Sequence, residues 1–189
     1  MRYHRRIGNK MTDIVKEYSK ALYELSEEEN LESEFLGEIR MLSKIISDSP
    51  EFISLLSAPN ISKYDRMNVI DKAFSGRFHE YICSFMKLMT RRGHARFILP
   101  CFTEYEKLWY EKSGIIVAEV KTAIEMTLPE KNVLHKKLEE YVGKSVEMRC
   151  TTDSSIIGGV SIMIGGILLE GSVKARLTAL HEALFKKTL

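Results

Sequence analysis

The sequence predicts an α+β protein, in which an N-terminal six-helix bundle precedes a smaller C-terminal α/β domain with a short sheet and two helices. The chain changes character near Gly114. Of its 17 aromatic residues, 15 precede Gly114, whereas seven of its 11 glycines lie in residues 114–189. Val and Ile number 15 in those 76 residues and 12 in the preceding 113. Because glycine favours turns and β-branched residues favour strands, the sheet is expected in the second part.

Apolar residues recur at helical spacing in the first part, which predicts its helices in order. One stripe covers residues 14–25 and a second covers residues 31–46. Ser49 followed by Pro50 is typical of a helix start, with serine as the cap and proline in the first turn. A third, shorter helix is therefore expected there.

Three more helices complete the expected bundle. Residues 62–65 fit a capping box, which predicts that a fourth helix begins there. Apolar residues at 82–89 predict a fifth helix that ends near Gly93, and those at 97–109 predict a long sixth helix. Six helices with short connections and one apolar face each are typical of a helical bundle over residues 11–113.

The second part, residues 114–189, has different patterns. Residues 115–123 predict a strand, and residues 129–142 predict a helix that stops at Gly143. Alternating Val146, Met148 and Cys150 predict a half-buried strand. Residues 160–164 and 167–169 flank two glycines, which indicates a hairpin. A closing amphipathic helix is expected from Val173, Leu177, Leu180 and Leu184.

The charge of the chain is close to neutral, which argues against a nucleic-acid binder. Its 28 basic and 26 acidic residues give a net charge of +2. Residues 1–10 alone carry four basic residues and no acid, so the remaining chain has a net charge of −2. We expect residues 1–10 to be a disordered basic extension outside the folded body.

Several classes of site are not supported by the sequence. The three cysteines are far apart and the five histidines are scattered, so neither a disulfide framework nor a metal site is expected. The longest uncharged stretch, residues 154–169, is too short and too rich in glycine for a membrane helix. No cofactor is expected either.

Two short motifs resemble catalytic loops but lack essential parts. Gly143-Lys144-Ser145 ends like a phosphate-binding loop, yet Leu138 replaces the first glycine and a helix precedes the motif. Residues 159–163 resemble a hydrolase elbow, but Met163 replaces the second glycine. With no catalytic group assigned, a binding or structural role is the default interpretation.

Other residues resemble a known family. Residues 18–25 (YSKALYEL) are similar to the YAKALFEL opening of the delta subunit of F-type ATP synthases, whose mitochondrial counterpart is the oligomycin-sensitivity-conferring protein. Arg91-Arg92-Gly93 resembles the family's step between the fifth and sixth helices. Residues 153–159 (DSSIIGG) and 169–177 (LEGSVKARL) resemble its C-terminal motif, although Glu170 replaces the usual Asp. The resemblance covers about residues 11–188.

The resemblance implies a non-catalytic stator subunit, which ties the catalytic head to the peripheral stalk so that rotation is coupled to ATP synthesis. In this family the N-terminal domain binds the N-terminal helix of an alpha subunit of the head through its first and fifth helices. The matching positions here are Tyr18, Ala21, Leu22, Leu25, Phe85, Met86 and Met89. Among these we expect Ala21 and Met86 to be the most accessible.

The C-terminal domain is implied to bind the C-terminal end of a b-type stalk subunit. The matching motif residues are Asp153, Gly158, Gly159, Gly171, Ser172, Lys174 and Arg176. The two adjacent glycines are expected to allow a positive φ or a close backbone approach before a strand. The protein would lie peripherally at the cytoplasmic face of a bacterial plasma membrane, held there by its partners.

A different interpretation remains open from the residues alone. Exposed helical faces without catalytic groups would also suit an adaptor or scaffold for helical ligands outside any ATP synthase. A nucleotide-dependent enzyme rests only on residues 143–145 and is the weakest of the three hypotheses.

Overall fold

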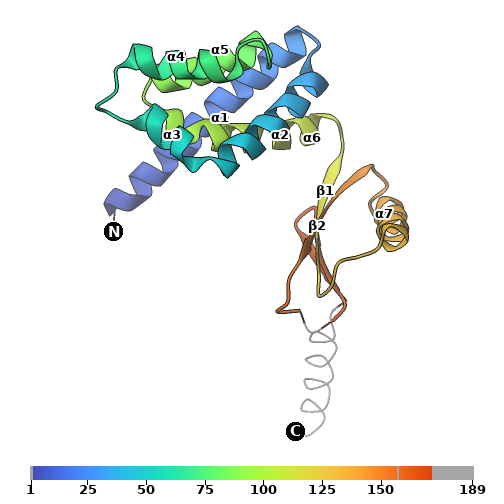
Figure 1. Cartoon of the computed structure of the whole chain (residues 1–189). Helices are drawn as coiled ribbons and strands as arrows, with labels where there is room; N and C mark the ends of the chain where they lie inside the picture. Colours follow the sequence, from blue (N-terminus) through green and yellow to red (C-terminus); the bar gives the residue numbers. More distant parts are fainter. Residues whose placement is uncertain (1, 157, 172–189) are drawn as a thin grey trace, which may run out of the picture. The chain divides into compact units, whose positions relative to one another are not determined.

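The computed structural model describes residues 2–156 and 158–171, and it confirms a mixed α+β fold (Figure 1). The chain divides into two compact units, Met1–Trp109 and Tyr110–Leu189. The division falls in the last turns of the long helix that ends at Lys112, just before the boundary predicted at Gly114. The closing helix expected from Val173, Leu177, Leu180 and Leu184 lies outside the described residues.

The helices of the first unit follow one another through short connections. They are α1 (Arg2–Glu28), α2 (Glu32–Asp48), α3 (Pro50–Ser57), α4 (Lys63–Phe74), α5 (Glu80–Arg91) and α6 (Ile98–Lys112), with a one-turn 3₁₀ helix, η1 (Ala95–Phe97), before α6. The sequence predicts a disordered extension over residues 1–10, but α1 begins at Arg2 and includes residues 2–10. Residues 2–10 contain no proline and a single glycine, so little in them opposes helix formation.

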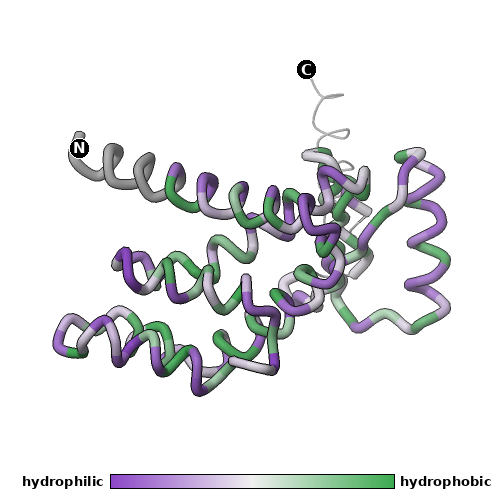
Figure 2. The backbone as a smooth tube through the Cα atoms, turned by 90° about the horizontal axis from the view of Figure 1, so that it is seen from above, coloured by the Kyte–Doolittle hydropathy of each residue, from purple (hydrophilic) through white to green (hydrophobic). Residues whose placement is uncertain are grey.

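The helices enclose one apolar core, with Phe35, Ile39, Leu42 and Phe102 at 1% exposure or less. Figure 2 shows apolar and polar residues interleaved along these helices, as expected where each helix buries one face. The sequence signals locate the starts of α3 and α4, although the Ser49 side chain makes no capping hydrogen bond. Pro50 lies in the first turn of α3 after Ser49, and the Ser62 hydroxyl accepts a hydrogen bond from the Asp65 amide at 3.1 Å.

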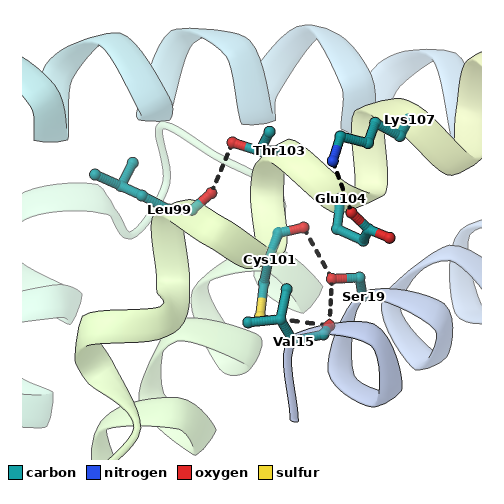
Figure 3. Close-up of polar contacts among 7 residues, drawn as sticks. All are labelled: Val15, Ser19, Leu99, Cys101, Thr103, Glu104 and Lys107. Atoms are coloured by element: carbon teal, nitrogen blue, oxygen red, sulfur yellow. Dashed lines mark hydrogen bonds and ion pairs between the residues drawn. The ribbon is translucent and has the colours of Figure 1, made fainter. Parts of the chain in front are cut away.

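Buried polar contacts fix α1 against α6. The Tyr105 hydroxyl donates to the Ser26 hydroxyl oxygen at 2.7 Å and to the Glu32 carbonyl at 3.3 Å. The Ser19 hydroxyl donates to the carbonyl oxygens of Val15, at 2.6 Å, and Cys101, at 3.0 Å (Figure 3). Because Ser19, Ser26 and Tyr105 are each 0% exposed, these bonds replace water for groups that would otherwise be unsatisfied.

The second unit contains a four-stranded sheet with strand order β2-β1-β3-β4. Strand β1 (Ile116–Thr122) pairs parallel with β2 (Val146–Thr152), and α7 (Leu128–Val142) connects them. Strand β3 (Val160–Ile164) pairs antiparallel with β1 and with β4 (Ile167–Glu170). A small core of Ala118, Val120, Leu138, Val146, Ile162 and Ile164 lies between α7 and the sheet.

Glycines with positive φ occur where the sequence predicted turns. Gly165 and Gly166, at φ 56° and 81°, form the two-residue turn of the β3–β4 hairpin. Such a turn needs positive φ at both central residues, which glycine adopts without steric cost. Gly143, at φ 68°, ends α7 in the left-handed conformation. The predicted hairpin and helix stop are therefore confirmed.

We predict that Tyr105→Phe lowers the free energy of unfolding by about 1–2 kcal/mol, because a buried donor is removed while its acceptors remain. Urea unfolding followed by the fluorescence of Trp109, the single tryptophan of the chain, measures the change. Tyr64 is 70% exposed, so Tyr64→Phe is the matched control and should change stability by less than about 0.5 kcal/mol. Equal effects of both substitutions would contradict the role of the Tyr105 hydroxyl.

Two glycine-to-alanine substitutions should have opposite effects. Gly143→Ala should destabilise by about 1–2 kcal/mol, because alanine is strained at the positive φ found there. Gly37 lies on an exposed part of α2, where an added Cβ meets nothing within 4 Å. Gly37→Ala should therefore stabilise by about 0.5–1 kcal/mol. Urea unfolding followed by circular dichroism tests both, and changes of the same sign would contradict this explanation.

Candidate partner-docking sites

Helices α1 and α5 pack antiparallel and form a seam on the surface of the first unit. The Tyr18 ring makes edge-to-face contacts with Phe85 at 6.4 Å and with His94 at 5.9 Å between ring centroids. Beyond the other end of α1, the Tyr81 hydroxyl donates to the Glu29 carboxylate at 3.3 Å. The Glu29 charge raises the pKa of Tyr81. Residues nearer the start of α1 therefore contact residues nearer the end of α5, and residues after the end of α1 contact its start, so the two helices are antiparallel.

An apolar stripe of α1 borders this seam. Ile14, Tyr18, Ala21 and Leu25 follow one another at spacings of four, three and four residues, which places them on one face of the helix. Ala21 is exposed and the other three are partly exposed. We call this stripe, together with the partly exposed Tyr81 and His94 beside it, the docking seam. The spacing of its apolar residues suits an amphipathic helix, which presents an apolar stripe at the same spacing.

The structure separates the seven positions predicted to bind an alpha-subunit helix. Ala21 is exposed as predicted, and Tyr18 and Leu25 are partly exposed. The prediction that Met86 is accessible is wrong, because that face of α5 packs into the core of the unit. The side chains of Leu22, Phe85, Met86 and Met89 are between 0% and 8% exposed.

Sequence reasoning missed three residues of the docking seam. Ile14 belongs to the stripe that predicted the first helix, and Tyr81 lies one turn before Phe85. These spacings were a usable signal for both residues. His94 follows the end of α5 and reaches Tyr18 only through the tertiary fold, so no local pattern pointed to it.

A second surface lies between α1 and α6. A shallow groove of about 370 Å³ is lined by Val15, Lys16, Phe97, Pro100, Thr103, Glu104 and Lys107. Beside it lie the Ser19 contacts described above and an ion pair of 3.1 Å between Lys107 and Glu104 (Figure 3). Exposed ion pairs of this kind contribute about 0–1 kcal/mol, so packing and the Ser19 bonds are the main stabilising contacts here.

The motif residues of the second unit form a compact turn before β3. The Asp153 carboxylate accepts hydrogen bonds from the Ser155 hydroxyl at 2.6 Å and the Ser155 amide at 2.9 Å. These bonds hold the pKa of Asp153 below its usual value. Gly158 and Gly159 follow with φ 131° and 90°, which confirms the predicted positive φ.

The remaining motif residues follow β4. The Gly171 amide donates to the Val160 carbonyl at 2.9 Å and so extends the hairpin pairing by one bond. Ser172, Lys174 and Arg176, which were also predicted to contact the stalk, lie outside the described residues. Their role stays a prediction.

No catalytic arrangement emerges in the described ranges 2–156 and 158–171. Gly143-Lys144-Ser145 connects the end of α7 to β2, so the order of elements is the reverse of a phosphate-binding loop. Among the described residues, no group of three or more His, Cys, Asp or Glu side chains could hold a metal ion. Within the same ranges, no helix combines the length and the apolar composition of a membrane span.

Comparison with known proteins decides the family. The sequence model of the OSCP family, described as the ATP synthase delta (OSCP) subunit, matches residues 14–184. The chain belongs to this family. As a delta-family chain it is one component of an F-type ATP synthase, which is built from several different subunits. This finding confirms the resemblance carried by residues 18–25 and 153–177.

Individual relatives agree with this membership. The chain is similar to ATP synthase subunit delta of Clostridium perfringens (strain SM101 / Type A), with 28% identity over 92% of this chain and 97% of the relative. The corresponding protein of Chloroherpeton thalassium is 25% identical over 90% of this chain and 93% of the relative. A chain of the Toxoplasma gondii mitochondrial ATP synthase hexamer has a similar fold, with a TM-score of 0.70 at 14% identity, over 90% of this chain and 97% of the other.

Proposed function

We propose that this delta subunit is the non-catalytic joint between the catalytic head and the peripheral stalk of its ATP synthase. Rotation produces useful work only if the head is held while the rotor turns, so the joint has to bind both partners. The chain has two compact units, each with its own core, which supports an arrangement in which each unit binds one partner. Family membership supports the assignment to the synthase.

The first unit is proposed to bind the N-terminal helix of an alpha subunit in the docking seam. The observation that carries this proposal is the α1 stripe, which stays at least partly exposed beside α5 while Leu22, Phe85 and Met86 beneath it are buried. Ala21 lies in the middle of the stripe, and its small side chain allows close approach of a partner backbone. We also propose that α1 to α6 act as a single six-helix bundle, since a rigid seam requires that both of its helices are anchored in one core.

The second unit is proposed to bind the C-terminal end of a b-type stalk subunit. The turn at Asp153 and Ser155 and the positive φ of Gly158 and Gly159 give this segment a defined shape before β3. Ser172, Lys174 and Arg176 are proposed to contribute polar contacts. Exposed charge pairs would guide association more than they stabilise the complex.

The proposed location is peripheral, at the cytoplasmic face of a bacterial plasma membrane, with attachment through the partners. The bacterial relatives of similar length support this placement. Residues 1–10 precede the family match, and we propose that the joint does not require this basic segment.

The docking seam is tested by Ala21→Trp. A large ring at this exposed position should block a partner helix and weaken binding of a synthetic peptide, taken from the N-terminus of an alpha subunit, at least about tenfold, equivalent to about 1.4 kcal/mol. Fluorescence anisotropy of the labelled peptide gives the dissociation constant.

Lys20→Trp is the matched control, because Lys20 is exposed on α1 about 100° away from Ala21. It should change the dissociation constant less than about twofold, within ordinary surface effects. Circular dichroism should show the same helix content for both variants. If the two tryptophans weaken binding equally, or neither does, the docking seam is not the site for the alpha-subunit helix.

A further inference from the structure

The His94 side chain lies at one end of the docking seam and is held there by ring packing. Its ring centroid lies 5.9 Å from that of Tyr18, with the two planes at 78°, and 6.0 Å from that of Phe97. His94 and Tyr18 are both partly exposed. The His94 ring therefore belongs to the surface that a helix in the docking seam would contact.

The local turn depends on the backbone of His94 and not on its side chain. The His94 amide donates to the Met89 carbonyl at 2.8 Å, and the His94 carbonyl accepts from the Phe97 amide at 2.9 Å. His94 is the cap residue of η1, but its side chain makes no capping hydrogen bond. Serine, threonine, aspartate or asparagine would supply such a bond. The local structure therefore does not explain a histidine at this position.

One nitrogen of this side chain is enclosed without a partner. Among the described residues, the buried side-chain nitrogens that lack a hydrogen bond are Arg66 Nε and His94 Nδ1. Arg66 is still anchored through another nitrogen, which donates to the Leu56 carbonyl at 2.9 Å. A buried polar atom without a partner costs free energy, and a phenylalanine ring would fill a similar space without that cost.

The second nitrogen of the His94 ring is the one that a partner can reach. A proton on the enclosed Nδ1 would be a buried donor without an acceptor, so we assign the proton of the neutral ring to Nε2. Because His94 is partly exposed while Nδ1 is enclosed, Nε2 presents a hydrogen-bond donor at the end of the docking seam.

The charges around the two ends of the docking seam have opposite signs. Residues 87–96 contain one lysine, three exposed arginines and no acid. The Arg96 guanidinium lies 4.7 Å from the centroid of the Phe97 ring, which in turn packs against His94. At the other end, residues 24–32 contain five glutamates and no base. A carboxylate of a partner is therefore favoured at the His94 end.

We propose that His94 Nε2 donates a hydrogen bond to a carboxylate of the alpha-subunit helix in the docking seam. The inference rests on the proposed function and adds to it one specific contact, with an acidic side chain at the end of the apolar stripe of that helix. Apolar contacts are non-directional, whereas a charge-assisted hydrogen bond requires a defined geometry. His94 would thus set the register of the bound helix and select against amphipathic helices whose acidic residues lie elsewhere.

Three substitutions at position 94 separate the two nitrogens. His94→Gln places an amide near the position of Nε2, His94→Asn places one near Nδ1, and both remove the ring. The labelled alpha-subunit peptide should bind the glutamine variant within about threefold of the parent chain, and the asparagine variant at least about fivefold more weakly. His94→Phe keeps the ring and should weaken binding as much as His94→Asn, without lowering the urea midpoint of unfolding.

A double-mutant cycle identifies the acceptor. Each Asp and Glu of the peptide is replaced in turn by alanine, and the dissociation constant is measured for the parent chain and for His94→Phe. One replacement should weaken binding to the parent chain at least about fivefold, but binding to His94→Phe less than about twofold.

Ala21→Trp distinguishes a failure of this inference from a failure of the proposed function. If Ala21→Trp blocks the peptide while the three His94 variants bind alike, whether as the parent chain does or more weakly, the docking seam remains the site and the Nε2 contact is wrong. A cycle in which no acidic residue couples to His94 would also overturn the contact. If Ala21→Trp binds the peptide as the parent chain does, the helix docks elsewhere and both proposals fail.

Discussion

The packing of α1 against α5 and α6 is the constraint on which the first unit depends, because this helix contributes to the core and to the surface at once. Leu22 and Tyr23 point into the core, while Ser19 and Ser26 bond to α6. The remaining face carries the partly exposed stripe of the docking seam. A binding surface on α1 can resist force only if the other faces of the helix are fixed. The two buried serines are small enough to let α6 approach closely, and their hydroxyls replace the water that this approach excludes.

The second unit also combines a buried core with apolar side chains at its surface, but its core is smaller. Its few buried residues lie between one helix and the middle of the sheet, and the β3–β4 hairpin keeps apolar side chains at its edge. The backbone of this segment gives a physical reason for the residues of the family motif. Asp153 closes a turn through Ser155, and the two glycines that follow take positive φ, which lets the chain enter β3 in register with β1. These requirements of the backbone account for the residue types at these positions without a catalytic role for any of them.

Much of the fold could be predicted from local pattern, since periodicity and turn residues report directly on helices and strands. The helix stop at Gly143 and the glycine turn at 165 and 166 are examples. The docking seam could be predicted only in part. The apolar face of α5 is broad, so the sequence does not distinguish the buried Met86 from the residues beside α1. The contact of His94 with Tyr18 and the placement of β1 between β2 and β3 are set by tertiary packing, and no local spacing encodes them.

We propose that this delta-family protein transmits force between the catalytic head and the peripheral stalk without performing a reaction of its own. ATP-driven proton pumping by membrane vesicles depleted of the protein tests it most directly, with ATP hydrolysis measured in the same sample. Adding back the purified chain should restore pumping, while the hydrolysis rate of the head stays within about twofold and the chain alone hydrolyses no ATP. Pumping that is unchanged by depletion, or ATP hydrolysis by the chain itself, would contradict the account.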